Sequence, residues 1–242
     1  MFGKKNKDQK QLIEFYPWTE DVFQIVYGPV SAIKNVPDFW KKMPKYHRGD
    51  ELVLGPLDNK SVNASLKHCM VYLDALTGGY HYVTWCDIVV KNVRGIPQLT
   101  WRPDTLSPLA VRHVEQYPTP PGHYNAHFSW NMHWGVKTPK GWSTLFTHPL
   151  NRTDLPFTTV SGIMDTDQYW GAGNVTFHIK EGFEGIIPAG TPYMHVLPVK
   201  RAEWESKVNK DLQQSAHWAM ERKKKYIVGY YKKHLWVPKR YR

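Results

Sequence analysis

The sequence is poor in cysteine and has no long apolar runs, which narrows the classes of protein that it can encode. Cys69 and Cys86 are the two cysteines among 242 residues, too few for a disulfide scaffold or a thiolate metal cluster. We therefore expect free thiols and a cytoplasmic location. No run approaches about 18 consecutive apolar residues, so the sequence predicts no membrane-spanning helix. Residues 1–11 are charged and lack the apolar run of a signal peptide, so we expect a flexible basic leader.

Two common catalytic signatures are also missing. The chain contains no Gly-x-Ser-x-Gly nucleophile elbow and no Walker phosphate loop. Cys69 directly follows His68, and adjacent residues on a strand point to opposite faces. A paired Cys/His nucleophile is therefore not indicated, and buried thiols are the better interpretation.

The composition and the local patterns indicate a folded, mainly β protein. Hydrophobic residues make up 41% of the chain and aromatic residues 14%, enough for a sizeable core. Alternation at Phe23, Ile25 and Tyr27 predicts a half-buried strand. Short β-branched and aromatic runs between proline and glycine turns predict further strands over 80–91, 127–134, 143–147, 175–179 and 194–198. We expect one β-rich domain over residues 12–199, built as a barrel or a sandwich.

Positive charge is concentrated at the C-terminal end. Residues 200–242 hold 13 Lys and Arg against 4 Asp and Glu, whereas the rest of the chain is nearly neutral. Apolar residues recur about every four positions from Trp204 to Met220, which predicts an amphipathic helix packed on the β domain. Beyond it, aromatic residues such as Tyr226 and Trp236 interleave with the basic ones. This pattern suits binding to nucleic acid or to an acidic partner, and equally suits packing on the protein itself or on a neighbouring subunit.

Histidine is abundant, with 12 residues. His123, His127 and His133 share parity, so one continuous strand would place them on one face. His148 and His195, on other strands, could join them to bind Zn, Fe or Cu. The alternative is a set of ordinary polar or stacking histidines.

Two carboxylates follow a glycine in the stretch Gly162-Ile163-Met164-Asp165-Thr166-Asp167. At a strand end Asp165 and Asp167 would share a face, and one of them could act as a general base. The alternative is an aspartate-rich turn that caps its own backbone.

The whole chain resembles an uncharacterised family found in tailed phages, especially marine ones, and in some bacteria. The residues that carry this resemblance are Lys67–Met70, Asp74–Tyr80, Phe146–Arg152, Gly162–Asp167 and Gly190–Pro192. The resemblance implies a location in the host cytoplasm and brings no established activity.

Residues 136–199 resemble the core of the dUTPase and dCTP deaminase superfamily. The resemblance implies a dUTPase-like β-clip barrel or a distorted jelly roll, here with an added C-terminal amphipathic helix. It implies Asp165 as the general base beside Asp167, and Tyr169 as the residue that stacks on a pyrimidine. The substrate side of the implied site consists of Asn151, Arg152, His148 and His195. The resemblance further implies Mg²⁺ on a triphosphate and a homo-oligomer, in this superfamily a trimer with shared sites.

The chain departs from that superfamily at several points. Gln168 is an extra residue before Tyr169, and Asn151-Arg152-Thr153-Asp154 replaces the Arg-Ser-Ser phosphate loop. The basic C-terminal segment stands in place of a glycine-rich closing arm. Three hypotheses follow: a nucleotide-binding protein that acts as a Mg-dependent phosphohydrolase, a non-catalytic phage structural or host-takeover binding protein with a basic tail, and a His-ligated metalloenzyme on a β-barrel.

Overall fold

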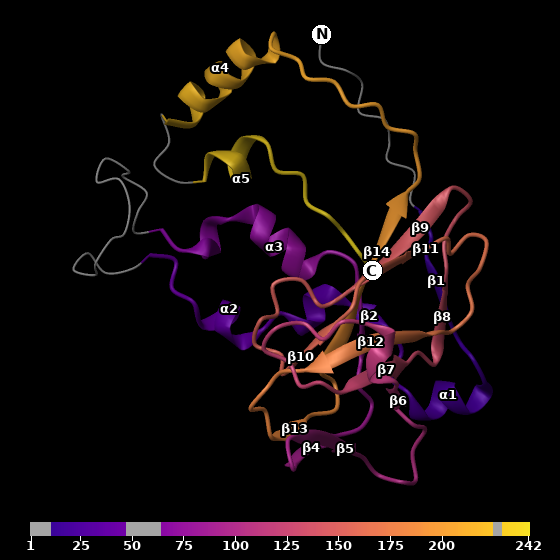
Figure 1. Ribbon diagram of the computed structural model, residues 1–242. Helices are drawn as coiled ribbons and strands as arrows, with labels where there is room; N and C mark the ends of the chain where they lie inside the picture. The colour runs from indigo at the N-terminus through magenta and orange to yellow at the C-terminus, as the bar shows by residue number, and fades with distance from the viewer. Residues whose placement is uncertain (1–10, 47–63, 225–228) are drawn as a thin grey trace. The chain divides into compact units, whose positions relative to one another are not determined.

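The computed structural model describes residues 11–46, 64–224 and 229–242 (Figure 1). The chain falls into two compact units. Unit 1 combines Met1–Val30 with Gly79–Arg201, and unit 2 combines Ser31–Gly78 with Ala202–Arg242. The sequence suggested one domain over 12–199 followed by a tail. That division of the chain stays a prediction.

Unit 1 carries the strands, in four sheets. A five-stranded sheet has the order β11 (Gly162–Met164), β9 (Trp142–Thr147), β14 (Pro192–Lys200), β3 (Tyr80–Val83) and β2 (Val30–Ser31). A four-stranded sheet has the order β10 (Phe157–Thr159), β12 (Asn174–Ile179), β7 (His127–Asn131) and β6 (Leu109–Arg112). The smaller sheets are β13 (Gly185–Ile187), β4 (Ile88–Val93) and β5 (Ile96–Thr100), and the pair β1 (Glu14–Pro17) and β8 (Trp134–Lys137).

The predicted mainly β character is confirmed, since strands make up 33% and helices 22% of the structure. The strands form several antiparallel sheets, and across the described residues these sheets do not close into a barrel. The five sequence stretches predicted as strands all contain one, because they concentrate the β-branched and aromatic residues that pack well on a pleated surface.

Aromatic side chains join the two largest sheets of unit 1 into one core. Trp130 of β7 stacks on Phe177 of β12, with ring centroids 3.8 Å apart. Trp130 also contacts Tyr193 of β14 at 4.8 Å, and Thr159 Oγ1 donates a hydrogen bond of 2.6 Å to the Tyr193 carbonyl. Burial of such large rings supplies most of the hydrophobic stabilisation of a core, so this contact fixes one face of the four-stranded sheet.

The strand predicted at Phe23, Ile25 and Tyr27 is wrong, because these residues belong to or follow a helix. Helix α1 spans Glu20–Ile25 and carries two acidic residues in its first turn, where the helix dipole favours them. Val22 and Val26, four positions apart, are buried while Phe23 is exposed. The buried residues therefore follow the helical period, and the alternation that suggested a strand lies on the exposed side.

Unit 2 is mainly helical. Its elements are η1 (Ala32–Asn35), α2 (Asp38–Lys42), η2 (Leu66–His68), α3 (Met70–Thr77), α4 (Leu212–Lys224) and α5 (Tyr230–His234). Helix α4 is shorter than the sequence pattern suggests. Its apolar residues Leu212 and Met220 are 61% and 64% exposed, and packing of this stripe on the β domain stays a prediction.

The end of the chain packs within unit 2. Trp236 Nε1 and Lys239 Nζ both donate to Asp74 Oδ2 of α3, at 2.9 and 2.7 Å. Ser31 Oγ donates to the Tyr241 carbonyl at 2.9 Å. Part of the basic, aromatic tail is therefore held by its own unit, which was one of the two interpretations from sequence. Tyr226 and most of the basic leader lie outside the described residues.

Candidate functional site

Asp165 and Asp167 lie together in the turn that follows β11. Ser143 Oγ donates to Asp165 Oδ1 at 2.6 Å, and the backbone N–H of Gly141 donates to Asp167 Oδ2 at 2.7 Å. Arg201 Nη1, just after β14, lies 3.1 Å from Asp165 Oδ1 and 2.8 Å from Asp167 Oδ1. The sequence analysis missed Arg201, which it counted only as part of the basic C-terminal segment.

The two carboxylates have different surroundings. The Asp167 side chain is 2% exposed, and the hydrogen bond from Arg201 lowers its pKa to about 2. The Asp165 side chain is 60% exposed, and its contacts with Ser143 and Arg201 both fall on Oδ1. Asp167 is thus an enclosed anion that joins two chain segments, whereas Asp165 is the carboxylate that a ligand could reach.

The predicted substrate residues do not all lie at this turn. Tyr169, which follows Asp165 by four residues, is 62% exposed. Arg152 is buried and forms a two-pronged pair with Asp154, Nε to Oδ1 and Nη2 to Oδ2, each at 2.9 Å. Asn151 adopts a left-handed φ of 59° in the same turn. The guanidinium expected to position a phosphate is therefore engaged by a neighbouring carboxylate.

His148 and His195 contact the turn that contains Asn151 and Arg152, and not the turn that contains Asp165. His148 Nδ1 accepts from the Thr159 N–H at 3.3 Å, so its Nε2–H donates to the Arg152 carbonyl at 3.1 Å. His195 Nδ1 accepts from the Leu150 N–H at 3.4 Å. Across the sheet, the His195 ring meets the His81 ring edge-on at 4.6 Å. Burial lowers the pKa of His81 and of His148, so these rings are neutral at pH 7.

A second histidine group lies on the four-stranded sheet, and it only partly matches the predicted set. His127 of β7 meets His178 of β12 edge-on at 4.7 Å, and His123 lies 6.2 Å from His178. His133 lies elsewhere, against Trp85 at 5.0 Å, because β7 ends at Asn131 and the strand parity breaks there. His178 was missed because its own segment contains no second histidine.

No metal site of three ligands is present in this group. Within residues 11–46, 64–224 and 229–242, no set of three His, Cys, Asp or Glu side chains is placed to hold a metal ion. His123 already uses both ring nitrogens, Nδ1 with the Pro121 carbonyl at 3.0 Å and Nε2 with Thr158 Oγ1 at 2.9 Å. The prediction of a metal-binding histidine face stays a prediction.

The hydrogen bonds assign the tautomers of two of these rings. The Pro121 carbonyl can only accept, so His123 carries its proton on Nδ1. The Thr119 hydroxyl donates to Asn125 Oδ1 at 2.8 Å, so it accepts from His127 Nε2–H at 3.0 Å. The His127 tautomer that this bond sets carries a lone pair on Nδ1. Burial and the neighbouring His127 and His123 lower the pKa of His178 to about 4.

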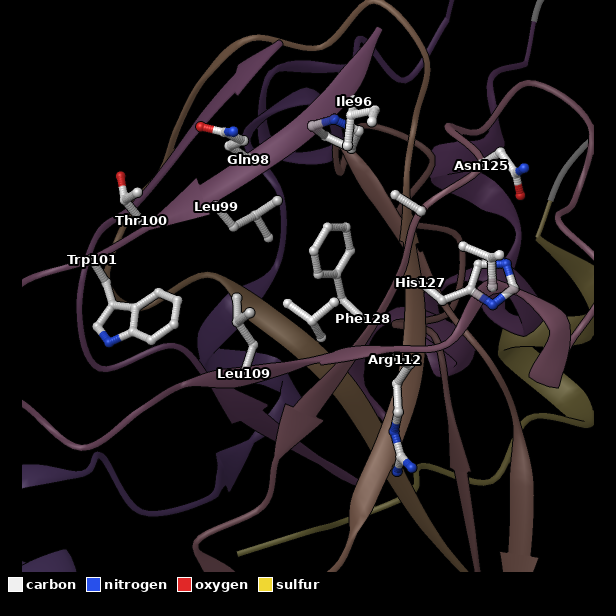
Figure 2. A pocket seen from close by; sticks show the side chains of 14 residues that line it. Ile96, Gln98, Leu99, Thr100, Trp101, Leu109, Arg112, Asn125, His127 and Phe128 are labelled. Carbon is white, nitrogen blue, oxygen red and sulfur yellow. The ribbon is translucent and has the colours of Figure 1, made fainter. Parts of the chain in front are cut away.

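An apolar cavity of about 520 Å³ opens between β5 and the strands β6 and β7 (Figure 2). Figure 2 shows Leu99, Leu109 and Phe128 around its interior, with Gln98 and Thr100 on the far side of β5. Phe128 forms a buried base, and Val111 at the rim is 78% exposed. Asn125 and His127 stand at one end. β5 and β6 are each the last strand of their sheet, so both carry backbone groups that a ligand can bond.

Comparison with known proteins assigns no function, because no family model and no curated protein matches this chain. In the part of the chain that the structure describes, no helix combines the length and apolar character needed to span a bilayer.

Proposed function

We propose that the protein binds a small molecule with an apolar or aromatic body in the cavity between β5, β6 and β7. The observation that carries this proposal is the cavity itself, at about 520 Å³. Ligand pockets in proteins measure about 300–1,000 Å³ and are lined mostly by hydrophobic and aromatic side chains with a few polar groups. The buried Phe128 and the half-exposed Trp101 offer such a lining.

The cavity also combines features that a ligand would satisfy. The rim residues Ile96 and Val111 are exposed, and their burial by a ligand would be favourable at about 25 cal/mol per Å². The open edges of β5 and β6 supply directional N–H and C=O groups. Asn125 adds a side-chain amide at one end. A ligand with a flat apolar body and a hydrogen-bonding end matches this arrangement.

A nucleotide, expected from the superfamily resemblance, is one molecule of this kind, since its base is aromatic. Its triphosphate would have to extend from the cavity. Hydrolysis by Asp165 with Mg²⁺ stays a prediction, as do the trimer and the binding of nucleic acid or an acidic partner by the C-terminal segment.

Binding of 1-anilinonaphthalene-8-sulfonate, an aromatic probe, tests the proposed pocket. Val111→Trp should fill the cavity from an exposed edge-strand position without disturbing the core, and should largely abolish the saturable fluorescence increase of the probe. Ile163→Trp is the matched control, because Ile163 is also an exposed edge-strand residue, on β11, outside the cavity. Equal probe binding by the two variants would contradict the proposal.

A further inference from the structure

The four-stranded sheet has a second, polar face that is buried yet short of hydrogen-bond partners. Strand pairing sets Arg112 of β6 beside His127 of β7, and the pairing of Phe177 with Phe128 brings His178 beside His127 on the other side. Ser129 lies two residues along β7, on the same face as His127. This set, Arg112, His127, Ser129 and His178, is named the polar row.

Five atoms of the polar row have no partner among the described residues: Arg112 Nε, His127 Nδ1, Ser129 Oγ, and both ring nitrogens of His178. His127, Ser129 and His178 are each at most 1% exposed. Buried polar groups in folded proteins nearly always have a partner, and a group without one points to a bound water, ion or ligand. Because these atoms lie along one face of the sheet, a single ligand on that face could bond several of them.

A proline-rich segment covers the polar row. Tyr117 lies against His178 at 5.7 Å, Thr119 bonds His127, and His123 bonds Thr158 beside His178. The intervening residues Pro118, Pro120 and Pro121 stiffen this cover by fixing their backbone φ angles. This cover shields the row from solvent. Hydrogen bonds and charges act more strongly in such a buried place than in water.

The free atoms specify what the row can bind. Arg112 Nε, the Ser129 hydroxyl and one nitrogen of neutral His178 are donors. His127 Nδ1 and the other nitrogen of His178 are bare lone pairs that accept. Three donors and two acceptors beside one fixed positive charge complement an oxyanion that carries its own protons. Arg112 opposes a bound cation, in line with the lack of a three-ligand metal set in the described residues.

We propose that the polar row is a binding site for protonated phosphate, in which Arg112, Ser129 and His178 donate to the phosphate oxygens while His127 and His178 accept from its hydroxyl groups. The site adjoins the proposed ligand cavity, because Arg112 and His127 also line that cavity, but the Arg112 side chain points to the opposite side of β6 from Phe128 (Figure 2). The ionisable groups that face the row are Arg112, His127, His178, His123 and Tyr117.

Calorimetric titration of inorganic phosphate into the full-length protein tests this site. Binding should be saturable and weaken as the pH rises from about 6 to about 8, because phosphate then loses the proton that the row accepts. Sulfate at the same ionic strength is the control ion, since it carries no proton at these pH values and should bind more weakly. Phenyl phosphate, with one hydroxyl group, distinguishes a site for free phosphate from one for a phosphate ester.

Two variants separate binding from folding. Arg112→Gln should weaken phosphate binding roughly tenfold or more by removing a charged donor, whereas Arg102→Gln, an exposed arginine paired with Asp104, should leave it unchanged. Ser129→Ala should weaken binding roughly threefold to tenfold. It should not lower the melting temperature without phosphate, because it deletes an unpartnered buried hydroxyl.

Several outcomes would overturn the proposal. Equal, non-saturating effects of phosphate and sulfate would show only general salt stabilisation. Phosphate binding that is the same in Arg112→Gln and Arg102→Gln would place the ion elsewhere, and no binding at either pH would leave buried water as the partner of the row. Val111→Trp, which fills the cavity, should still bind phosphate, so failure of either proposal is seen separately.

Discussion

Acid should destabilise unit 1 through His178, and the effect is large enough to measure. His178 is fully buried, and its pKa falls from 6.5 to about 4 because burial and the neighbouring His127 and His123 disfavour its charged form. The unfolded chain then binds a proton more readily than the folded one, so stability is full above about pH 6.5 and declines as the pH falls towards 4.

The size of this effect follows from the shift. One pKa unit is worth about 1.4 kcal/mol, so His178 alone should remove about 2 kcal/mol between pH 7 and about pH 4.5. The carboxylates of the unfolded chain are still mostly ionised at pH 4.5, which keeps their contribution small. His81, whose pKa burial also lowers, adds to the decline and will remain when His178 is replaced.

Urea unfolding of wild-type protein and of His178→Gln, at pH 7, 6, 5 and 4.5 in buffers free of phosphate, measures this contribution. Amide hydrogen exchange of peptides from β7 and β12 ties the change to the correct sheet. The variant should lose about 2 kcal/mol less than wild type over this range. His217→Gln, an exposed residue on α4, is the matched control and should behave as wild type. A decline of wild-type size in His178→Gln would refute the assignment.

Two further predictions concern the aspartate turn. Asp167→Asn should lower the melting temperature more than Asp165→Asn, because Asp167 is the enclosed anion held by Gly141 and Arg201. The lowered pKa of Asp167 means that this stabilisation is present above about pH 4 and lost as the pH falls towards 2. Equal melting temperatures of the two variants would contradict a stabilising role of the contacts that Asp167 makes with Gly141 and Arg201. If the predicted phosphohydrolase exists, pyrophosphate release from a panel of dNTPs with Mg²⁺ should disappear in Asp165→Asn, and release that is absent from wild type or undiminished in the variant would end that hypothesis.

Local sequence patterns are enough to predict five of the stretches that contain strands. Runs such as 80–91 and 143–147 contain β-branched and aromatic residues bounded by turn residues, and this is a local preference that needs no knowledge of the partners. The same local logic placed Asp165 and Asp167 on one side of the chain. The structure agrees, because the intervening Thr166 is fully buried and bonds Thr138 and Thr144 instead.

The sequence pattern gave a wrong prediction where the two-residue period of a strand and the period of a helix were both present in one segment. Phe23, Ile25 and Tyr27 alternate as a strand would, but Val22 and Val26 are the residues that the core buries. A pattern in one segment cannot show which of its faces will be covered, because the covering residues lie elsewhere in the chain.

Residues far apart in the sequence become partners only in the folded chain. Arg201 reaches Asp167 from 34 residues away, and His178 joins His127 through the pairing of β12 with β7. Charged, hydroxyl and imidazole side chains can bond many different groups, so the residue type alone does not select the partner. Sheet register selects it, since a shift of one residue would turn each of these side chains to the opposite face.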